Sequence, residues 1–487
     1  MNFTPYLPGF KASCGRRRKS SLQKLQEQLG ACRKLEIHHL RKLFSPVMSI
    51  DLLKKRKRVS NSSQRARIYT TEVTFWAFLV QVLWQNASCA EAVKAVQTWF
   101  YDADSGRQIS SNTASYAAAR LRLSYFKLLA IFHFITQKAT VIPPEKLWYG
   151  RRVKKIDGTS FQLNDTEENQ QEFPQSKAQK KGCGFPRCQV QGLVCLATGL
   201  LLDWVETNIN VHDSVAWKKL WEFFIPEDII LADRAYGSYI NFSLLLKREV
   251  DMVTRLNQKR KFSLKDALRR NSKNDIIVKW QKPKKKPRHL SVKEWERIDD
   301  ELEVRLIKYK VEEPGFRTKE VIIATTLLNF EQLSTQAIID LYAERWGIEV
   351  RFRDIKTTMK MGALKGRTPL MVKKEIIMTA IAYNLTRFLI NEALKKKPEI
   401  SYKRVSFAGA LYQIRQWMSR FEGEHSVTEL HRLISAFYDS LIDCPVPERL
   451  GRNEPRARKQ RSKYKILNKK RSEMKVEPHR SKYKKIA

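Results

Sequence analysis

The sequence predicts an α/β protein in which a mixed β-sheet core carries a β-rich insertion, follows an all-helical region and precedes a helical, basic region. Three stretches lead to this expectation. Residues 71–138 are apolar with helical character, residues 152–256 change to short apolar runs of strand length, and residues 331–397 return to helical periodicity. A chain of 487 residues is also too long for one ordinary domain.

Composition points to a polyanion as the partner. The chain has 92 Lys and Arg against 50 Asp and Glu, a net charge of +42, which fits DNA or RNA better than a neutral small molecule. A membrane surface is the weaker alternative, because no basic amphipathic helix stands alone and no apolar run reaches the ~18 residues of a membrane span. The N-terminus does not resemble a signal peptide, and the cysteines lack the usual zinc-ligand spacing. We therefore expect free thiols in a reducing cytoplasm and no membrane partner.

The region before the sheet divides into a basic arm, residues 1–70, and a helical domain, residues 71–146. Ser88 and Glu91 have the spacing of a capping box, so a helix is expected to start there. Residues 111–123 begin with capping residues, continue with small alanines and end with arginines. This pattern is compatible with a recognition helix in a DNA groove and equally with an ordinary packing helix.

The core is expected to have the element order of a ribonuclease-H-like mixed sheet. Strand and helix patterns follow one another as β-β-β-α-β-α-β, and a further helix comes after the insertion. The second and third strands form a hairpin around Gly199. The expected elements are strands at 152–157, 189–198, 201–208, 228–233 and 251–256 and helices at 214–224 and 239–248.

Residues 257–326 are predicted to form the β-rich insertion. A basic, proline-broken loop at 282–288 precedes two alternating strands, 302–311 and 316–325, joined by a Pro-Gly turn. The insertion interrupts the core domain before its last helix. The expected boundaries are 147–395 for the α/β core domain with its insertion, 396–446 for a helical C-terminal region and 447–487 for a basic tail.

Residues 341–356 are the stretch around which the rest of the chain is organised. At about 100° per residue, a helix here presents an apolar stripe and an adjacent polar stripe. The apolar stripe contains Leu341, Ile348, Phe352, Ile355 and Met359, and the polar stripe contains Tyr342, Arg345, Glu349, Arg353 and Lys356. The pairs Arg345–Glu349 and Glu349–Arg353 have ion-pair spacing, so a solvated amphipathic helix is the alternative interpretation.

Asp157 and Asp233 each end a short apolar strand of the expected sheet. Ligands of open α/β sheets bind at the carboxyl edge of the strands, where these side chains and Glu349 would converge. Three carboxylates without a cation would repel one another, but with Mg²⁺ they are a normal ligand set. Two such ions can activate a water or a 3′-hydroxyl on one side of a phosphodiester and stabilise the leaving oxygen on the other. Taken alone, either aspartate would be an ordinary strand-end turn residue.

The spacing Tyr-x2-Arg-x3-Glu-x6-Lys between Tyr342 and Lys356 resembles the signature of the YREK group of insertion-sequence transposases. These are DDE transposases with a ribonuclease-H-like catalytic core. Asp157-Gly-Thr resembles the family's first-aspartate motif, and residues 232–237, Ala-Asp-Arg-Ala-Tyr-Gly, resemble its second. The resemblance covers most of residues 70–395.

The resemblance implies that Asp157, Asp233 and Glu349 are the catalytic acids and the metal ligands of two Mg²⁺ ions, with Mn²⁺ able to substitute. The residues implied to hold DNA phosphate are Tyr342, Arg345 and Lys356, and Arg353 of the same polar stripe is a further candidate for phosphate binding. The implied reaction is cut-and-paste transposition. The helical domain would bind double-stranded DNA at the element's terminal inverted repeats, and the free 3′-hydroxyl would then attack target DNA. A homodimer in the bacterial cytoplasm, associated with the nucleoid, is the implied active form, with residues 396–446 in a dimerisation role.

One departure from the family concerns tryptophan. Some relatives hold a flipped base near a hairpin intermediate with a tryptophan of the insertion, and neither Trp280 nor Trp295 has the expected spacing. The hairpin route is therefore not implied. Two other functions stay open at this point: a ribonuclease-H-like nuclease or resolvase without strand transfer, and a catalytically inert DNA-binding protein.

Overall fold

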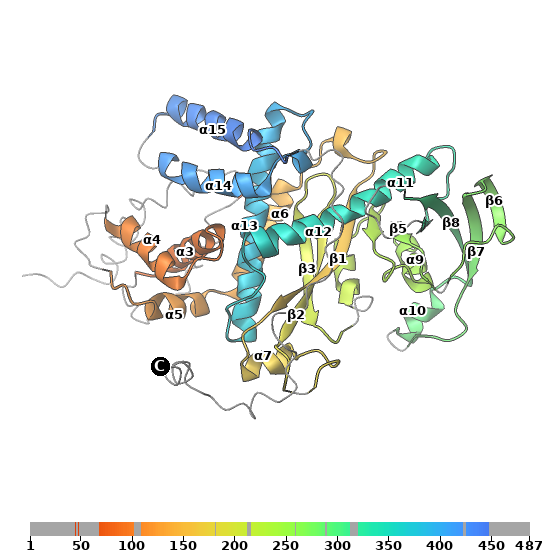
Figure 1. Ribbon diagram of the computed structural model, residues 1–487, viewed down its shortest axis with the longest axis horizontal. Helices are drawn as coiled ribbons and strands as arrows, with labels where there is room; N and C mark the ends of the chain where they lie inside the picture. The colour runs from red at the N-terminus through yellow and green to blue at the C-terminus, as the bar shows by residue number, and fades with distance from the viewer. Residues whose placement is uncertain are drawn as a thin grey trace, which may run out of the picture.

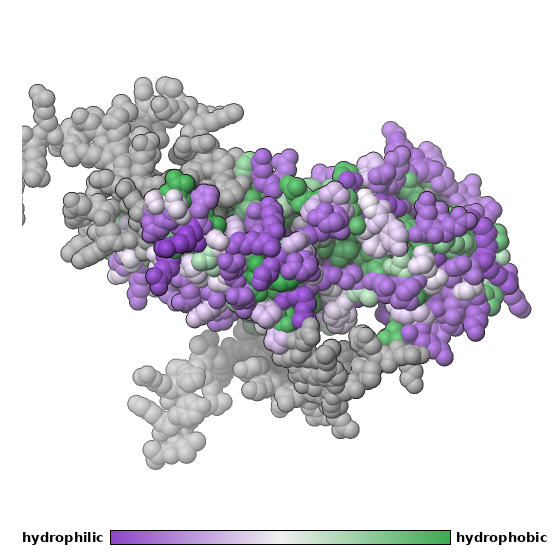
Figure 2. Space-filling view, turned by 90° about the horizontal axis from the view of Figure 1, so that it is seen from above, coloured by the Kyte–Doolittle hydropathy of each residue, from purple (hydrophilic) through white to green (hydrophobic). Residues whose placement is uncertain are grey.

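The computed structural model describes residues 68–447 apart from 102–108, 181, 212–215, 259, 288–289, 312–319 and 422–424, together with Phe44 and Val47. Most of the basic arm, the basic tail and the expected Pro-Gly turn therefore lie outside the described residues. Figure 2 shows a mostly hydrophilic face on which hydrophobic residues form scattered groups. No described helix is both long and apolar enough to span a membrane.

The core of the described chain is a mixed β-sheet (Figure 1). Its first half consists of β1 (Val153–Gln162), β2 (Arg187–Cys195), β3 (Leu201–Asn208), β4 (Ile229–Ala232) and β5 (Asp251–Arg255). Strand β2 pairs antiparallel with both β1 and β3, whereas β4 pairs parallel with both β1 and β5. The order β3-β2-β1-β4-β5 is ribonuclease-H-like, as predicted. The predicted hairpin is confirmed, and Gly199 in its turn has a φ of 72° that favours glycine.

The insertion adds β6 (Ala267–Ser272), β7 (Asp275–Gln281), β8 (Glu301–Lys310) and β9 (Glu320–Thr325). Strand β9 pairs antiparallel with β5, so the insertion continues the core sheet in the order β5-β9-β8-β7-β6. The sequence predicts β8 and β9 close to their observed positions but misses β6 and β7. Strand β6 lies at the sheet edge and is exposed along most of its length, so it lacks the alternation by which strands are recognised. Strand β7 carries a detectable apolar run, Ile276-Ile277-Val278.

The helices that precede the sheet in the sequence and those that follow it share one hydrophobic core. The first group is α3 (Thr71–Leu83), α4 (Cys89–Tyr101), α5 (Ala114–Arg122) and α6 (Tyr125–Ala139). The second group is α13 (Pro369–Ala393), α14 (Phe407–Trp417) and α15 (Val427–Ile442). Helix α13 contacts α3 and α6 of the first group and α14 and α15 of its own group (Figure 1). The regions predicted as separate before and after the core therefore pack against the same long helix.

Local signals account for several helix boundaries. The predicted capping box is confirmed, because the backbone N–H of Ser88 donates to the Glu91 carboxylate and the N–H of Glu91 donates to Ser88 Oγ at 3.2 Å. The helix expected at 214–224 is a 3-10 segment (Trp217–Phe223) with both tryptophans buried. Shorter helices are α7 (Glu167–Glu172), α9 (Tyr239–Leu246) and α10 (Val292–Glu296).

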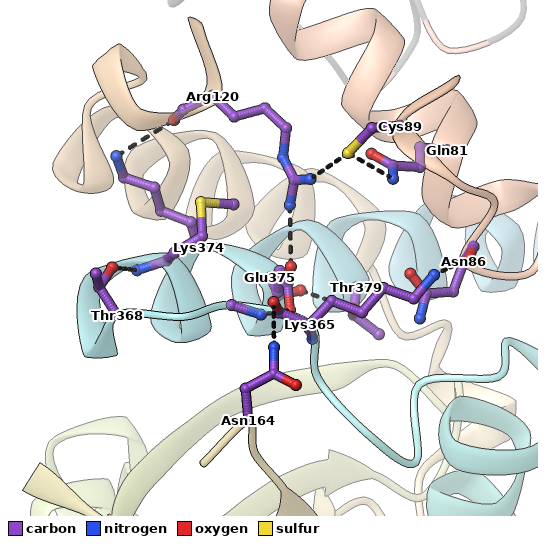
Figure 3. Close-up of polar contacts among 12 residues, drawn as sticks. Gln81, Asn86, Cys89, Arg120, Asn164, Lys365, Thr368, Lys374, Glu375 and Thr379 are labelled. Carbon is purple, nitrogen blue, oxygen red and sulfur yellow. Dashed lines mark hydrogen bonds and ion pairs between the residues drawn. The ribbon is translucent and has the colours of Figure 1, made fainter. Parts of the chain in front are cut away.

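A buried polar cluster joins α5 to α13 and to the segment before α13 (Figure 3). Arg120 Nη2 donates to Glu375 Oε1 at 3.0 Å. The other carboxylate oxygen of Glu375 accepts the backbone N–H groups of Lys365 at 2.8 Å and Gly366 at 3.1 Å. Arg120 is therefore held inside the protein, and of the two arginines that end α5 only Arg122 is exposed. This end of α5 has the character of a packing helix.

Glu375→Gln is expected to lower the free energy of unfolding by about 3 kcal/mol, because Arg120 would keep a buried charge without a carboxylate partner. Chemical denaturation followed by circular dichroism measures the change. Glu172→Gln is the matched control, since the ion pair of Glu172 with Lys373 is largely exposed and should contribute less than about 1 kcal/mol. Equal effects of the two substitutions would contradict the importance of the buried pair.

Candidate active site

Asp157 and Asp233 lie side by side on neighbouring parallel strands. The parallel pairing of β1 with β4 ends at Lys155 opposite Leu231. Two residues further along both strands, the same register brings Asp157 level with Asp233, which directly follows β4. Because side chains alternate along a strand, both aspartates point to the same face as Leu231. That face is covered by the helical run that contains residues 341–356.

The expectation that the first strand ends at Asp157 is wrong. Strand β1 continues to Gln162, because its other edge pairs with β2 from Lys154 opposite Cys195 to Gln162 opposite Arg187. Asp157 therefore lies in the middle of β1, at the level where β4 ends and leaves one side of β1 unpaired. The end of β4 alone opens the sheet at this point.

The helical run changes type along its length. It consists of α11 (Thr335–Ala343), a 3-10 turn (Glu344–Trp346), α12 (Gly347–Arg353) and a π-turn (Asp354–Thr358). The expectation of one uniform α-helix is therefore wrong in detail. The predicted apolar stripe is buried at every position: Leu341, Ile348, Phe352, Ile355 and Met359. Tyr342, expected on the polar stripe, is buried as well, because it packs into the apolar cluster formed with the end of the sheet.

Arg345 stands among the three predicted acids. Its Nη1 donates to Asp157 Oδ2 at 3.5 Å, and its Nη2 donates to Glu349 Oε1 at 3.3 Å. Its charge also interacts with that of Asp233. The Glu349 side chain is 42% exposed and the Asp157 side chain 22% exposed, so the group opens to solvent on the side of the helix.

The pKa of Asp157 reflects these neighbours. Burial is the largest effect, and together with the charges of Glu349 and Asp233 it raises the pKa of Asp157 to about 6. The hydrogen bond from the Gly158 N–H and the charge of Arg345 act in the opposite direction. The charges of Glu349 and Asp233 therefore act on Asp157 in the folded chain, and a bound cation would relieve this repulsion.

The other polar-stripe residues have three different environments. Lys356 Nζ donates to Ser160 O at 2.9 Å and to Thr159 Oγ1 at 3.3 Å, so this lysine reaches across to β1. Burial raises the pKa of Tyr342 to about 12, so its hydroxyl stays protonated at neutral pH. Arg353 is exposed, and within the described part of the chain it has neither a hydrogen bond nor an ion pair. The second ion pair expected of a solvated helix is therefore not formed.

A lysine lies buried between β1 and the helix, and its neighbours in the sequence do not indicate that it is buried. Lys155 is fully buried on β1, two residues before Asp157, and burial lowers its pKa to about 7. A Cβ at Gly347 would lie 2.7 Å from Lys155 Nζ, so a side chain there would crowd the ammonium group and keep α12 from approaching β1. The sequence feature that indicates this close approach is Gly347, because a glycine within a helical run costs about 1 kcal/mol of stability relative to alanine and so needs a structural reason.

The residue types at this site fit a divalent metal ion. Carboxylate oxygens from Asp157, Asp233 and Glu349 are the ligands that such ions prefer. Among the described residues, no three Asp, Glu, His or Cys side chains are arranged to hold a metal. Instead, the Arg345 guanidinium takes the place of a cation between two of the carboxylates. A metal ion would compete with Arg345 for these oxygens.

Asp157→Asn is expected to stabilise the metal-free protein at neutral pH. The folded chain raises the pKa of Asp157 from the ordinary 3.8 to about 6, so ionisation of this carboxyl opposes folding. The penalty is nearly absent below about pH 3, grows between the ordinary pKa and the folded pKa, and is constant above the folded pKa. We expect a gain of roughly 1–3 kcal/mol at about pH 7 and almost none at about pH 3, measured by denaturation in EDTA. A loss of stability at neutral pH would contradict this assignment.

Neither tryptophan considered for base stacking faces the acids. Trp280 belongs to the apolar cluster on the opposite face of the sheet, together with Ile156, and its ring centroid lies 5.5 Å from that of Phe242. The guanidinium of Arg260 lies 3.9 Å from the centre of the Trp280 ring. Trp295 packs against the same cluster. The departure noted in the sequence therefore persists in the fold.

Comparisons with known proteins identify the family of this chain. Residues 148–385 match the family described as the transposase DDE domain. The chain is 24% identical over 349 residues to transposase InsG for insertion sequence element IS4 of Escherichia coli (strain K12), covering 70% of this chain and 75% of that protein. It is 32% identical over 89 residues to the "Probable transposase for insertion sequence element IS5377" of Geobacillus stearothermophilus, covering 18% of this chain and 22% of that protein.

A solved structure of the piggyBac transposase synaptic complex with hairpin DNA aligns with 83% of this chain and 85% of that chain, with a TM-score of 0.42 and 10% identity. A likeness at this level has no bearing on the site.

The ribonuclease-H-like sheet and the match to the transposase DDE domain define an enzyme of the class that uses divalent metal ions to cut and join nucleic acid strands. The chain is a DDE transposase, and it binds and processes DNA. Membership of the YREK group stays a prediction.

Proposed function

We propose that this transposase acts by a cut-and-paste route on the terminal inverted repeats of its own element. The single observation that supports this most is the position of Arg345 between Asp157 and Glu349, with Asp233 level with Asp157 on the next strand. This arrangement combines an acidic set for metal ions with a guanidinium that can bind a phosphate. In a solvated surface helix, an arginine would point to water and would not contact an aspartate on a strand of the sheet.

In the proposed mechanism, Asp157, Asp233 and Glu349 hold Mg²⁺, as two ions, with Mn²⁺ able to substitute. The metal, when bound, supplies activation of the attacking water or 3′-hydroxyl and stabilisation of the leaving oxygen. Arg345 exchanges its carboxylate partners for the phosphate, to which it offers two donors in a fork. Lys356 supplies a mobile positive charge from beside β1.

Two further residues contribute to phosphate binding in this proposal. Tyr342 remains protonated, because its pKa is raised to about 12 by burial, and it can therefore donate a neutral hydrogen bond. Arg353 is exposed and unpaired among the described residues, so its guanidinium is available to DNA without breaking a contact. Its role would be in affinity more than in the chemical step.

The proposal extends to assembly and location. The helical domain 71–146 would bind the element ends, with the basic arm 1–70 and the tail 447–487 adding phosphate contacts. Residues 396–446 would serve a homodimer that brings two ends and the target DNA together. As in a bacterial insertion sequence, the site of action would be the cytoplasm at the nucleoid.

Strand transfer distinguishes this function from its two rivals. Purified protein is incubated with Mg²⁺, a labelled oligonucleotide that carries the end of the element with a free 3′-hydroxyl, and a target plasmid. Covalent joining of the label to the plasmid is expected. Cleavage of intact ends without joining would favour the nuclease or resolvase, and binding without either reaction would favour the inert DNA-binding protein.

Binding to DNA is expected to weaken steeply as salt rises, because of the net charge of +42. The log–log slope should be roughly −0.9 for each phosphate contact. Removing the residues after 458 should flatten the slope and reduce the affinity for unrelated DNA most. Fluorescence anisotropy at several salt concentrations measures both effects. An affinity that does not change with salt would contradict the electrostatic interpretation.

A further inference from the structure

The catalytic helix carries an aspartate that belongs to no part of the proposed acidic set. Asp354 begins the π-turn, between Glu349 and Lys356 in sequence, and is buried. Its Oδ2 accepts a hydrogen bond from Arg387 Nη2 of α13 at 2.6 Å, and it also lies 3.4 Å from Arg351 Nη1. The helical run is therefore joined to α13 by an ion pair as well as by apolar contacts.

Aromatic rings surround the arginine of this pair. Arg387 is fully buried, and its guanidinium carbon lies 4.7 Å from the ring centre of Phe407, 5.5 Å from that of Tyr383 and 5.8 Å from that of Tyr402. Its Nε donates to the Tyr383 hydroxyl at 3.3 Å. These rings come from α13, from the segment after it and from α14. The position of Arg387 is therefore set by three segments of the chain, and Asp354 takes its position from Arg387.

Stability alone is a poor reason for this arrangement. Two buried arginines share one aspartate, and Arg387 Nη1 is buried without a hydrogen-bond partner. Burying such charges is expensive, and apolar side chains of similar volume usually stabilise a fold at least as well. An ion pair does fix the orientation of the helix that carries it, because a carboxylate bound by a guanidinium can adopt only a few orientations.

The π-turn makes orientation important at this point of the helix. The Met359 N–H donates to Asp354 O at 2.9 Å, an i to i+5 bond that inserts an extra residue into the turn. Residues after Asp354 are therefore rotated relative to residues before it. Glu349 faces Asp157 through Arg345, while Lys356 reaches Ser160 O on β1. Both contacts depend on how the helix is rotated about its axis.

We propose that Asp354 and Arg387 are a positioning pair, which sets the rotation of α12 and the π-turn so that Glu349 and Lys356 face the reacting phosphate. This proposal rests on the proposed function of the acidic set. Neither residue touches the substrate. The pair acts through the helix, and its loss should disturb the geometry of the metal site more than the affinity for DNA.

The first test compares Asp354→Asn with Asp228→Asn. Asp228 is a fully buried aspartate that also has two cationic partners, Arg152 at 2.9 Å and Lys154 at 2.5 Å, but it lies at the opposite end of β4 from Asp233. Mg²⁺ demands near-ideal octahedral geometry, so a displaced ligand should harm it more than Mn²⁺. We expect Asp354→Asn to raise the ratio of Mn²⁺-supported to Mg²⁺-supported end cleavage about tenfold. Asp228→Asn should lose similar stability and leave this ratio unchanged.

The second test does not depend on cleavage of DNA. Fe²⁺ with ascorbate and peroxide cuts a polypeptide next to the residues that bind the ion. The unaltered protein should be cut near Asp157, Asp233 and Glu349, and Asp354→Asn should lose the cut near Glu349 while keeping the other two. The triple variant Asp354→Leu, Arg351→Met, Arg387→Met removes the shared aspartate together with both of its buried arginine partners, so none of the three charges is left unpaired, and it guards against misfolding. It should be as stable as the unaltered protein and show the same missing cut.

The outcomes separate the two proposals. If the unaltered protein is cut near none of the three acids, the metal site is wrong, and the positioning role is wrong with it. If those cuts are present and the variants give the same pattern and the same metal ratio as the unaltered protein, only the positioning role is refuted. A metal ratio that rises equally in Asp228→Asn would likewise assign the effect to general loss of stability.

Discussion

Replacing Asp157, Asp233 or Glu349 with alanine is expected to reduce strand cleavage by about a thousandfold or more, which corresponds to roughly 4 kcal/mol of transition-state stabilisation. The reason is the shared position of these carboxylates. Asp157 and Asp233 are level on adjacent strands, and Arg345 links Asp157 to Glu349, so each acid contributes oxygens to the same small region. Loss of one ligand would leave the metal set incomplete. Gel assays with labelled element ends measure the cleavage rate.

Binding to the element ends should stay within about threefold of the unaltered protein in these variants, because DNA affinity arises mainly from the basic surface. Asp340→Ala is the matched control, since Asp340 is an exposed acid on α11 of the same helical run. It should cleave at the normal rate. Near-normal cleavage in any one of the three acid variants would remove that residue from the metal set.

Arg345→Ala and Lys356→Ala are each expected to slow cleavage by about a hundredfold, with a smaller loss for Tyr342→Phe. Arg345 has two donors close to the acidic set, and Lys356 places its ammonium group beside β1, where the phosphate would lie. Arg345→Lys should restore little activity, because a lysine cannot reproduce the two-pronged geometry. Arg353→Ala should weaken DNA binding and leave the rate at saturating DNA nearly unchanged.

The control for these cationic residues is Lys395→Ala, since the Lys395 side chain is 71% exposed on a helix end distant in sequence from the site. It should leave cleavage unchanged. If the helix were only a solvated surface, the substitutions of Arg345 and Lys356 would cost about 0.5 kcal/mol of stability or less and would not affect activity. Full activity in both variants would therefore reject this helix as the active-site helix.

Much of the fold follows from local patterns. The turn at Gly199, the capping box at Ser88 and the buried stripe from Leu341 to Met359 each depend on residues a few positions apart, and each is present in the structure. The edge strand β6 is different. Its exposed side chains carry no periodic signal, and its pairing with β7 gives it its structure.

The site shows the same division. The acids and the Tyr-Arg-Glu-Lys spacing could be proposed from the sequence, because residue type and helical spacing are local properties. That Asp157 lies within β1 rather than at its end could not be proposed, because the length of β1 depends on its pairing with β2. That Arg120 is internal could not be proposed either, because its partner Glu375 lies on a distant helix.

By itself, the sequence determined the types of most elements and the polyanion as partner, and it led to the proposed acidic set, since these depend on composition and on spacings within one strand or helix. Only the tertiary structure decided the register that places Asp157 opposite Asp233, the 3-10 and π-turns that divide the helical run from Thr335 to Thr358, and the ion pair of Asp354 with Arg387. The physical reason is that these features arise from contacts between residues far apart in the chain. Such contacts select one rotation and one register among several that local propensity would allow equally well.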